Sequence, residues 1–135
     1  MSFRTVLVVD DEEPLRQLLA VILRDRGYEA RCVGSGEEAL RELAAHDYDL
    51  VLTDVRMPRL DGPGLCRALQ AEPALRDTPV LILTSNADQE SLRLCREAGA
   101  RDVLLKPIGP HILHDAVQRH AGITVGLASF QAPKP

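Results

Sequence analysis

Short apolar runs alternate with amphipathic segments along the chain. The first run, Val6–Val9, is rich in β-branched residues, which is typical of a strand covered on both faces of a parallel sheet. From Pro14 the apolar residues recur at the spacing of one helical face as far as Leu23, and Gly27 follows a charged last turn. The beginning of the chain therefore predicts a strand followed by a helix.

The same alternation continues to about residue 120. Further strands are expected at 28–33, 49–53, 79–83 and 103–105, and helices are expected after Ser35, from Pro63, over about 87–98 and around 112–117. Strict alternation of this kind predicts an α/β fold, with a doubly wound, five-stranded parallel sheet and helices on both faces. In such a sheet, ligands bind beyond the carboxyl ends of the strands, where the strand order reverses.

The last fifteen positions break the alternation. Residues 1–120 are predicted to form one domain, and residues 121–135, which end in Pro-Lys-Pro, are predicted to be a C-terminal tail or linker.

Composition narrows the classes of protein that the chain can represent. Hydrophobic residues make up 45% of it and charged residues 27%, the balance of an ordinary globular domain. The sequence has neither an apolar run long enough to span a membrane nor the pattern of a signal peptide. A cytoplasmic location is therefore expected, and a membrane partner is not expected. The net charge of −4 offers no broad positive field, so direct binding of nucleic acid is not expected.

The cysteines, Cys32, Cys66 and Cys95, are odd in number and are expected to be reduced and at least half-buried.

Polar residues with related chemistry stand at the carboxyl ends of four predicted strands. They are Asp10 and Asp11 after the first strand, Asp54 after the third, Thr84 after the fourth and Lys106 after the fifth. Three converging carboxylates repel one another unless a cation compensates, and an all-oxygen site suits magnesium. A hydroxyl and an ammonium beside them are donors for oxyanions, so the set indicates phosphoryl chemistry.

The sequence around these residues resembles the receiver domains of bacterial two-component signalling. The similar blocks are Val8-Val-Asp-Asp-Glu12, Leu52-Thr-Asp-Val-Arg-Met-Pro58 with Asp61-Gly62, Leu83-Thr84, and Leu104-Leu-Lys-Pro107. The resemblance covers about residues 4–120. It implies a flavodoxin-like fold of five strand–helix units with the strand order 2-1-3-4-5.

The resemblance also assigns roles to individual residues. It implies that Asp54 is the phosphoacceptor and that Mg²⁺ is held by Asp10, Asp11, Asp54 and the backbone carbonyl of Arg56. Thr84 and Lys106 correspond to the residues that contact the phosphoryl oxygens. The peptide bond before Pro107 is expected to be cis.

The implied activity is a phosphoacceptor switch rather than a conventional enzyme, because the product is a signal. The implied phosphodonor is a sensor histidine kinase or a phosphotransfer protein. Phosphorylation would change the surface of the fourth helix, fifth strand and fifth helix for an unknown downstream protein or output domain, and a homodimer is possible.

Three positions bear on how such a switch would work here. Receiver domains usually place an aromatic residue three positions before the lysine of the fifth strand, where this chain has Val103. Arg56 and Asn86 occupy positions whose side chains overhang the phosphoryl site. Three roles stay open for the Arg56 side chain: pairing with Glu12, contacting a phosphoryl group, or lying solvated.

Simpler explanations exist for each residue taken alone. The acidic pair could cap the first helix, Asp54 could be a turn residue, Thr84 could cap the fourth helix, and Lys106 could be a solvated charge. Their joint occurrence at successive strand ends favours one site.

Two other functional classes are consistent with part of the pattern. A haloacid-dehalogenase-like phosphatase uses similar residues, but it carries its nucleophile on the first strand, whereas the acidic pair comes first here. A binding module that no longer takes phosphate is the second alternative. Separately, His111 and His114 could share a metal, although no third ligand is evident.

Overall fold

A computed structural model describes residues 4–86 and 88–121 of the chain. The predicted tail begins at Ala121, and residues 122–135 lie outside the described residues. The strands are β1 (Thr5–Val9), β2 (Glu29–Val33), β3 (Leu50–Asp54), β4 (Val80–Thr84) and β5 (Asp102–Leu105). The helices are α1 (Glu13–Asp25), α2 (Gly36–Ala45), α3 (Gly62–Ala71), α4 (Gln89–Glu97) and α5 (Pro110–His120).

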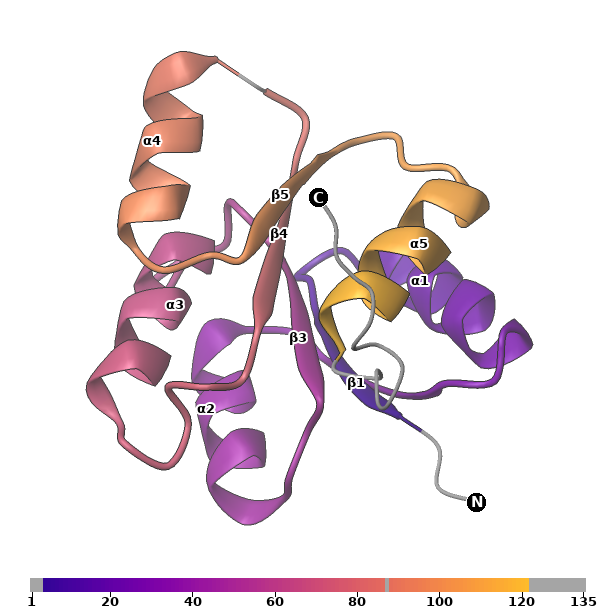
Figure 1. The fold of residues 1–135 in the computed structure, drawn as a ribbon, viewed down its shortest axis with the longest axis horizontal. Helices are drawn as coiled ribbons and strands as arrows, with labels where there is room; N and C mark the ends of the chain where they lie inside the picture. Colours follow the sequence, from indigo (N-terminus) through magenta and orange to yellow (C-terminus); the bar gives the residue numbers. More distant parts are fainter. Residues whose placement is uncertain (1–3, 87, 122–135) are drawn as a thin grey trace.

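The strands form one parallel sheet in the order β2-β1-β3-β4-β5, which confirms the predicted fold class and strand order. Helices α1 and α5 cover one face of the sheet, and α2, α3 and α4 cover the other (Figure 1). The chain turns to opposite sides after β1 and after β3, so the strand order reverses between these two neighbours. The crevice for a ligand is therefore expected at their carboxyl ends.

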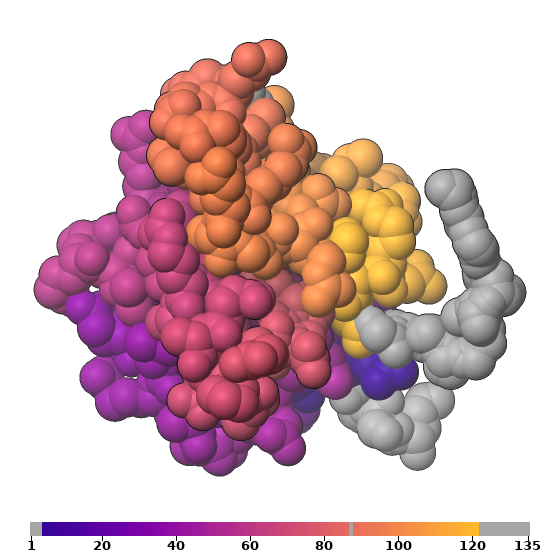
Figure 2. All heavy atoms as spheres, turned by 60° about the vertical axis from the view of Figure 1, so that its left-hand side comes forward, coloured from indigo at the N-terminus to yellow at the C-terminus, as the bar shows by residue number. Residues whose placement is uncertain are grey.

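Each face of the sheet has its own hydrophobic core. On the first face, Val6 and Val8 of β1 pack with Leu19 and Leu23 of α1 and with Leu113 of α5. On the second face the buried residues come from β1, β3, β4 and helices α2 to α4: Leu7, Val9, Val51, Ile82, Ala39, Leu65, Leu69 and Cys95 among others. Figure 2 shows the outer surface of this second face, where α3 and α4 lie against each other. Alternate side chains of β1 enter the two cores, as expected for a strand buried on both sides.

Three helices, α2, α3 and α4, begin at polar residues whose side chains cap them. The Ser35 hydroxyl accepts a hydrogen bond from the backbone N–H of Glu38 at 3.1 Å, which confirms the predicted N-cap of α2. The Glu38 side chain accepts from the N–H of Gly34 instead of Ser35, so the capping box is shifted by one residue on that side. Asp61 caps α3 and Asp88 caps α4 in the same way. Gly27, after α1, has a φ of +92°, a conformation that a side chain would strain.

Two strands extend one residue further than the sequence pattern predicted. Asp54 pairs with Leu83 and Thr84 pairs with Leu105 in the ladders of the sheet, so both residues end their strands instead of following them. Helix α4 begins at Gln89 rather than at about residue 87, because Asp88 takes the capping position.

All three cysteines are reduced, with Cys66 and Cys95 buried and Cys32 half-buried, as predicted. Among the described helices, none is both long enough and apolar enough to cross a membrane.

Candidate phosphoryl and magnesium site

Three carboxylates meet where the strand order reverses. Asp10 and Asp11 lie in the loop after β1, and Asp54 ends the neighbouring strand β3. One ligand oxygen from each lies within 4.8 Å of the others, and within the described residues this is the only such group of three potential metal ligands. The predicted acidic cluster is therefore present.

Asp10 is held with one oxygen bonded and the other unpartnered. Its side chain is fully buried, and Oδ1 accepts a hydrogen bond from the backbone N–H of Glu12 at 2.8 Å. Oδ2 is also buried and has no hydrogen-bond partner among the described residues. Burial raises the pKa of Asp10 above its ordinary value of 3.8, and the negative charges of Asp54 and Asp11 raise it further against the opposing effects of Glu12 and Lys106. An ionised Asp10 therefore needs a cation beside Oδ2.

Asp54 is buried at the end of β3, where one of its oxygens accepts a hydrogen bond and forms an ion pair. Oδ1 lies 2.9 Å from the backbone N of Val55 and 2.9 Å from the Nζ of Lys106. Lys106 follows β5, and 20% of its side chain is exposed, so it is not the solvated charge of the simpler explanation. Because Oδ1 makes both contacts, Oδ2 is the Asp54 oxygen left open to a ligand.

Thr84 stands beside these groups at the end of β4, with its hydroxyl occupied locally. Oγ1 accepts from the backbone N of Asn86 at 3.0 Å and donates to the backbone carbonyl of the same residue at 3.0 Å. The side chain therefore stabilises the turn after β4. A phosphoryl group at Asp54 would compete with Asn86 for this hydroxyl.

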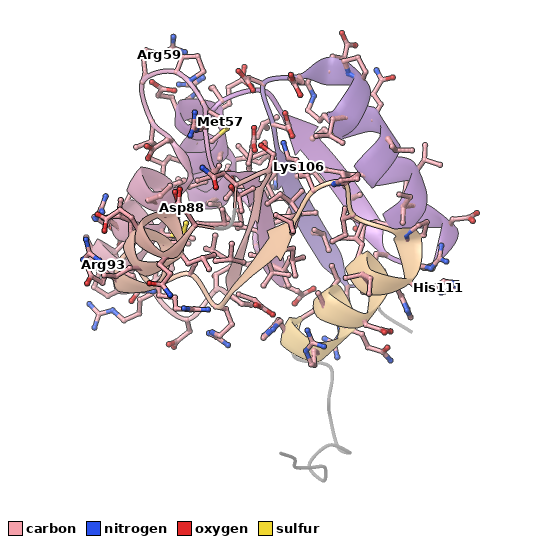
Figure 3. The ribbon with its side chains drawn as sticks, turned by 90° about the horizontal axis from the view of Figure 1, so that it is seen from above. Met57, Arg59, Asp88, Arg93, Lys106 and His111 are labelled. Carbon is pink, nitrogen blue, oxygen red and sulfur yellow. The ribbon has the colours of Figure 1, made fainter. Side chains whose placement is uncertain are left out.

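Asp11, Asp54, Thr84 and Lys106 line one cleft of about 500 Å³, with Asp10 buried outside its lining. Its lining consists of Asp11, Glu12, Asp54, Val55, Arg56, Thr84, Ser85, Asn86 and Lys106. In Figure 3, which looks down on the carboxyl edge of the sheet, Lys106 lies near the centre among carboxylate oxygens, whereas Arg59 and His111 lie at the rim. The cleft has the polar lining and position expected of a phosphoryl-binding site.

The loop after Asp54 is shaped by a close backbone contact. A Cβ on Gly62 would lie 2.6 Å from the backbone carbonyl of Asp54, so a side chain there would displace the acceptor strand. Arg59 has a φ of +67°, and its Nε donates to Glu37 of α2 at 2.9 Å. The loop is therefore anchored to α2 and packed directly against the end of β3.

Magnesium suits the donors that the cluster presents. All three side chains offer carboxylate oxygens, the ligands that hard divalent cations prefer, and Asp10 Oδ2 is a buried anion without a partner. Thiolate and imidazole ligands, which select zinc and other softer metals, are absent from this group of three. The residues therefore fit the metal that the sequence predicted.

The Arg56 side chain lines the cleft and is exposed. Among the described residues it forms no ion pair, so the pairing with Glu12, one of the three roles left open, is not formed in this structure. Its charge acts instead on Asp88, whose pKa is lowered first by the hydrogen bonds from Ser91, then by Asn86, and least by Arg56.

Two further expectations can be compared with the structure. The peptide bond between Lys106 and Pro107 is cis, as the resemblance implied. His111 and His114 belong to no potential metal site within residues 4–86 and 88–121. His114 instead packs edge-on against Tyr28, with ring centroids 6.0 Å apart.

Backbone groups that shape the site could not be found from sequence patterns. No residue type marks the Val55 N–H as a donor to Asp54, because every residue except proline carries that group. The close approach of Gly62 to the Asp54 carbonyl was only partly indicated by the sequence, through the Asp61-Gly62 pair that follows Pro58.

Comparison with known proteins assigns the family. Residues 6–118 match the family model for the response regulator receiver domain. The sensory/regulatory protein RpfC of Xanthomonas campestris is 36% identical over 126 residues, which are 92% of this chain and 17% of that protein. The DNA-binding response regulator MtrA of Mycobacterium tuberculosis is 35% identical over 105 residues, which are 78% of this chain and 45% of that protein. The chain thus spans less than half the length of these relatives.

Solved structures agree with this assignment. The receiver domain of the sensor histidine kinase PA1611 from Pseudomonas aeruginosa, which was crystallised with a magnesium ion in its active-site cleft, superposes with a TM-score of 0.83. It is 33% identical, and the match covers 90% of this chain and 99% of that one. The chain belongs to the response regulator receiver domain family of two-component signalling. The phosphatase alternative is thereby excluded.

Proposed function

We propose that Asp54 accepts a phosphoryl group from the phosphohistidine of a sensor histidine kinase or phosphotransfer protein. The observation that supports this most directly is the convergence of Asp54 with the carboxylates of Asp10 and Asp11, next to the Lys106 ammonium that is ion-paired with Asp54. Small phosphodonors such as acetyl phosphate would serve as well. Similar proteins include a sensory/regulatory protein and a DNA-binding response regulator. The family therefore serves more than one kind of output, and the proposal specifies the phosphoacceptor step only.

In the proposed reaction, Asp54 Oδ2 attacks the phosphorus atom in line with the leaving group. The new O–P bond forms as the N–P bond of the phosphohistidine breaks, and the electron pair of that bond leaves with the imidazole. Lys106, which is ion-paired with Oδ1, would bind one product oxygen, and Thr84 would leave Asn86 to bind another. These two side chains supply one positive donor and one neutral donor.

Asp10, Asp11, Asp54 and the backbone carbonyl of Arg56 would hold Mg²⁺. When bound, the ion offsets the charge of the carboxylates and of the transferred group. The role of the protein is to keep the carboxylates converged although they repel one another. Because Asp10 is buried among like charges, this arrangement costs stability without a cation.

The proposed output is a change in the surface formed by α4, β5 and α5. Thr84 can turn toward a phosphoryl group only by giving up both of its bonds to Asn86, which would release the turn that leads to α4. Val103 is half-buried and packs with the second core, so it supplies no ring for the usual aromatic readout. We expect the turn after β4 to carry the signal. Self-association of the domain is a second output consistent with this proposal, whereas direct binding of nucleic acid is not part of it.

The product is a modified side chain that acts as a signal, so we propose a phosphoacceptor domain rather than a conventional enzyme. We also propose a cytoplasmic location, because the phosphodonors of two-component systems act there.

The test is phosphate incorporation from acetyl phosphate, followed by intact-protein mass spectrometry. The wild type should gain one phosphoryl group in Mg²⁺ and none in excess EDTA. Asp54→Asn should gain none, whereas Asp115→Asn, which changes an exposed carboxylate on α5, should behave like the wild type. Incorporation that survives Asp54→Asn would refute the assignment of the acceptor. No incorporation into folded wild type would favour the alternative of a binding module.

Arg56 offers a second test, because its exposed side chain lies at the mouth of the cleft. We expect the guanidinium to contact the phosphoryl oxygens and to restrict attacking water, so Arg56→Ala should lose phosphate faster than the wild type. Equal decay rates at the same magnesium and salt concentrations would show that the side chain has no role in phosphoryl lifetime.

A further inference from the structure

Arg16 of α1 makes a contact that links the helix to the acidic pair. Its Nη1 donates a hydrogen bond of 2.8 Å to the backbone carbonyl of Asp10. Strand β1 has already ended at Val9, and the Asp10 N–H is satisfied by the carbonyl of Val33 at 3.2 Å. Within the described residues, Arg16 provides the hydrogen bond that the Asp10 carbonyl accepts. The corner between β1 and α1 is therefore held from both sides.

The same guanidinium lies against the turn that follows β2. A Cβ on Gly34 would be 3.1 Å from Nη1, so the glycine leaves room for the arginine. This turn is itself anchored, because the Gly34 N–H donates to Oε1 of Glu38 at 2.7 Å. Arg16 thus joins three segments: its own helix, the end of β1 and the turn between β2 and α2.

Asp10 is restrained at three points as a result, and the first is the bond from its N–H to the carbonyl of Val33. Its carbonyl is held by Arg16, and its Oδ1 is held by the Glu12 N–H. The remaining atom, Oδ2, is buried without a partner and belongs to the acidic cluster. A small rotation of the corner would move Oδ2 and the adjacent Asp11 carboxylate away from Asp54.

We infer that Arg16 is a positioning residue of the magnesium site, which holds the Asp10–Asp11 corner so that both carboxylates reach the same cation as Asp54. The inference rests on the proposed function, since it requires that the cluster binds Mg²⁺. The action is through the backbone, because the guanidinium donates to the main-chain carbonyl of Asp10. Residues that orient metal ligands without touching the metal commonly contribute about 10-fold to 100-fold in affinity.

The chain contains a matched control on the same helix. Arg24 donates from Nη2 to the backbone carbonyl of Ala30 at 2.6 Å, which is also a bond from an α1 arginine to the main chain near β2. Arg24 lies about two helical turns from Arg16, toward the opposite end of the sheet. Loss of either bond should destabilise the fold to a similar extent, but only the Arg16 bond is near the acidic cluster.

The experiment measures Mg²⁺ affinity by calorimetry and the urea midpoint in EDTA, for wild type, Arg16→Met, Arg16→Lys and Arg24→Met. Both methionine variants should have similarly lowered urea midpoints, while only Arg16→Met should bind Mg²⁺ at least about 10-fold more weakly. Arg16→Lys, which keeps one donor, should recover part of that affinity and remains informative if the methionine variant does not fold.

Two results would overturn the inference: wild-type Mg²⁺ affinity in a folded Arg16 variant, or an equal loss of affinity in Arg24→Met. A wild type that binds no Mg²⁺ would instead refute the proposed function, so the two failures are distinguishable.

Discussion

Replacing Asp10 by asparagine should stabilise the metal-free protein while it abolishes magnesium binding. Asp10 is fully buried beside two other carboxylates, with ligand oxygens within 4.8 Å of one another. Two unit charges at that distance repel by about 3 kcal/mol at an effective dielectric constant of about 20. The Lys106 ammonium offsets part of this repulsion through its ion pair with Asp54. We therefore expect Asp10→Asn to raise the free energy of unfolding by about 1–2 kcal/mol in EDTA, or the Tm by about 4–8 °C.

The substitution preserves the local geometry, which makes the result interpretable. The asparagine oxygen can accept the same hydrogen bond from the Glu12 N–H, and its amide can donate to the neighbouring carboxylates in place of the unpartnered Oδ2. Asp11→Asn is the control, because Asp11 is exposed and its repulsion is screened by water. Asp11→Asn should change the free energy of unfolding by less than about half of the change expected for Asp10→Asn.

The effect of pH follows from the direction of the pKa shift. The folded-state pKa of Asp10 is raised above 3.8, so the native protein takes up a proton before the unfolded chain does as the pH falls. At pH values above its raised pKa, the ionised Asp10 side chain destabilises the native state to the full extent. As the pH falls from the raised pKa toward 3.8, protonation of Asp10 removes this destabilisation, so the free energy of unfolding rises. The advantage of Asp10→Asn should be greatest at neutral pH and should shrink through that window.

The assay is urea unfolding followed by circular dichroism, in EDTA and in saturating Mg²⁺, at several pH values. Magnesium should raise the stability of the wild type, by about 2.7 kcal/mol at a concentration about 100 times the Kd, and should leave Asp10→Asn unchanged. A mutant that is less stable than the wild type in EDTA would refute the reasoning, since it would mean that the ionised carboxylate supports the fold.

Three further perturbations test other parts of the structure. Lys106→Met should lower stability in EDTA by about 1–2 kcal/mol, because the carboxylates lose their cation, and Mg²⁺ should restore it; equal losses with and without Mg²⁺ would contradict this. Arg59→Gly should raise the urea-derived free energy of unfolding by about 0.5–1 kcal/mol, because relief of the positive φ outweighs an exposed ion pair; a loss would show that the pair dominates. Gly62→Ala should cost about 1–3 kcal/mol and reduce phosphate incorporation, because the new Cβ meets the Asp54 carbonyl; Gly109→Ala, where a Cβ meets nothing within 4 Å, is the control.

The alternation of apolar runs with amphipathic segments by itself determined the fold class. It could do so because burial of a strand on both faces and of one face of a helix leaves periodic signals within each segment. Local signals also predicted the N-cap at Ser35, where the interacting groups lie three residues apart. The candidate site residues emerged from the same local logic, since each one stands at the end of a predicted strand.

Tertiary structure decided how these residues meet. The pairing of β1 with β3 brings Asp10 to Asp54, and the position of β5 places the Lys106 ammonium on the acceptor carboxylate. The strands continue into Asp54 and Thr84 because the ladder bonds come from neighbouring strands, which no local pattern encodes. For the same reason no sequence pattern indicated that Arg56 and Glu12 would not pair within the described residues, or that Arg16 would donate to the Asp10 carbonyl. Periodicity reports what each segment buries, whereas contacts between distant segments depend on the packing of the whole domain.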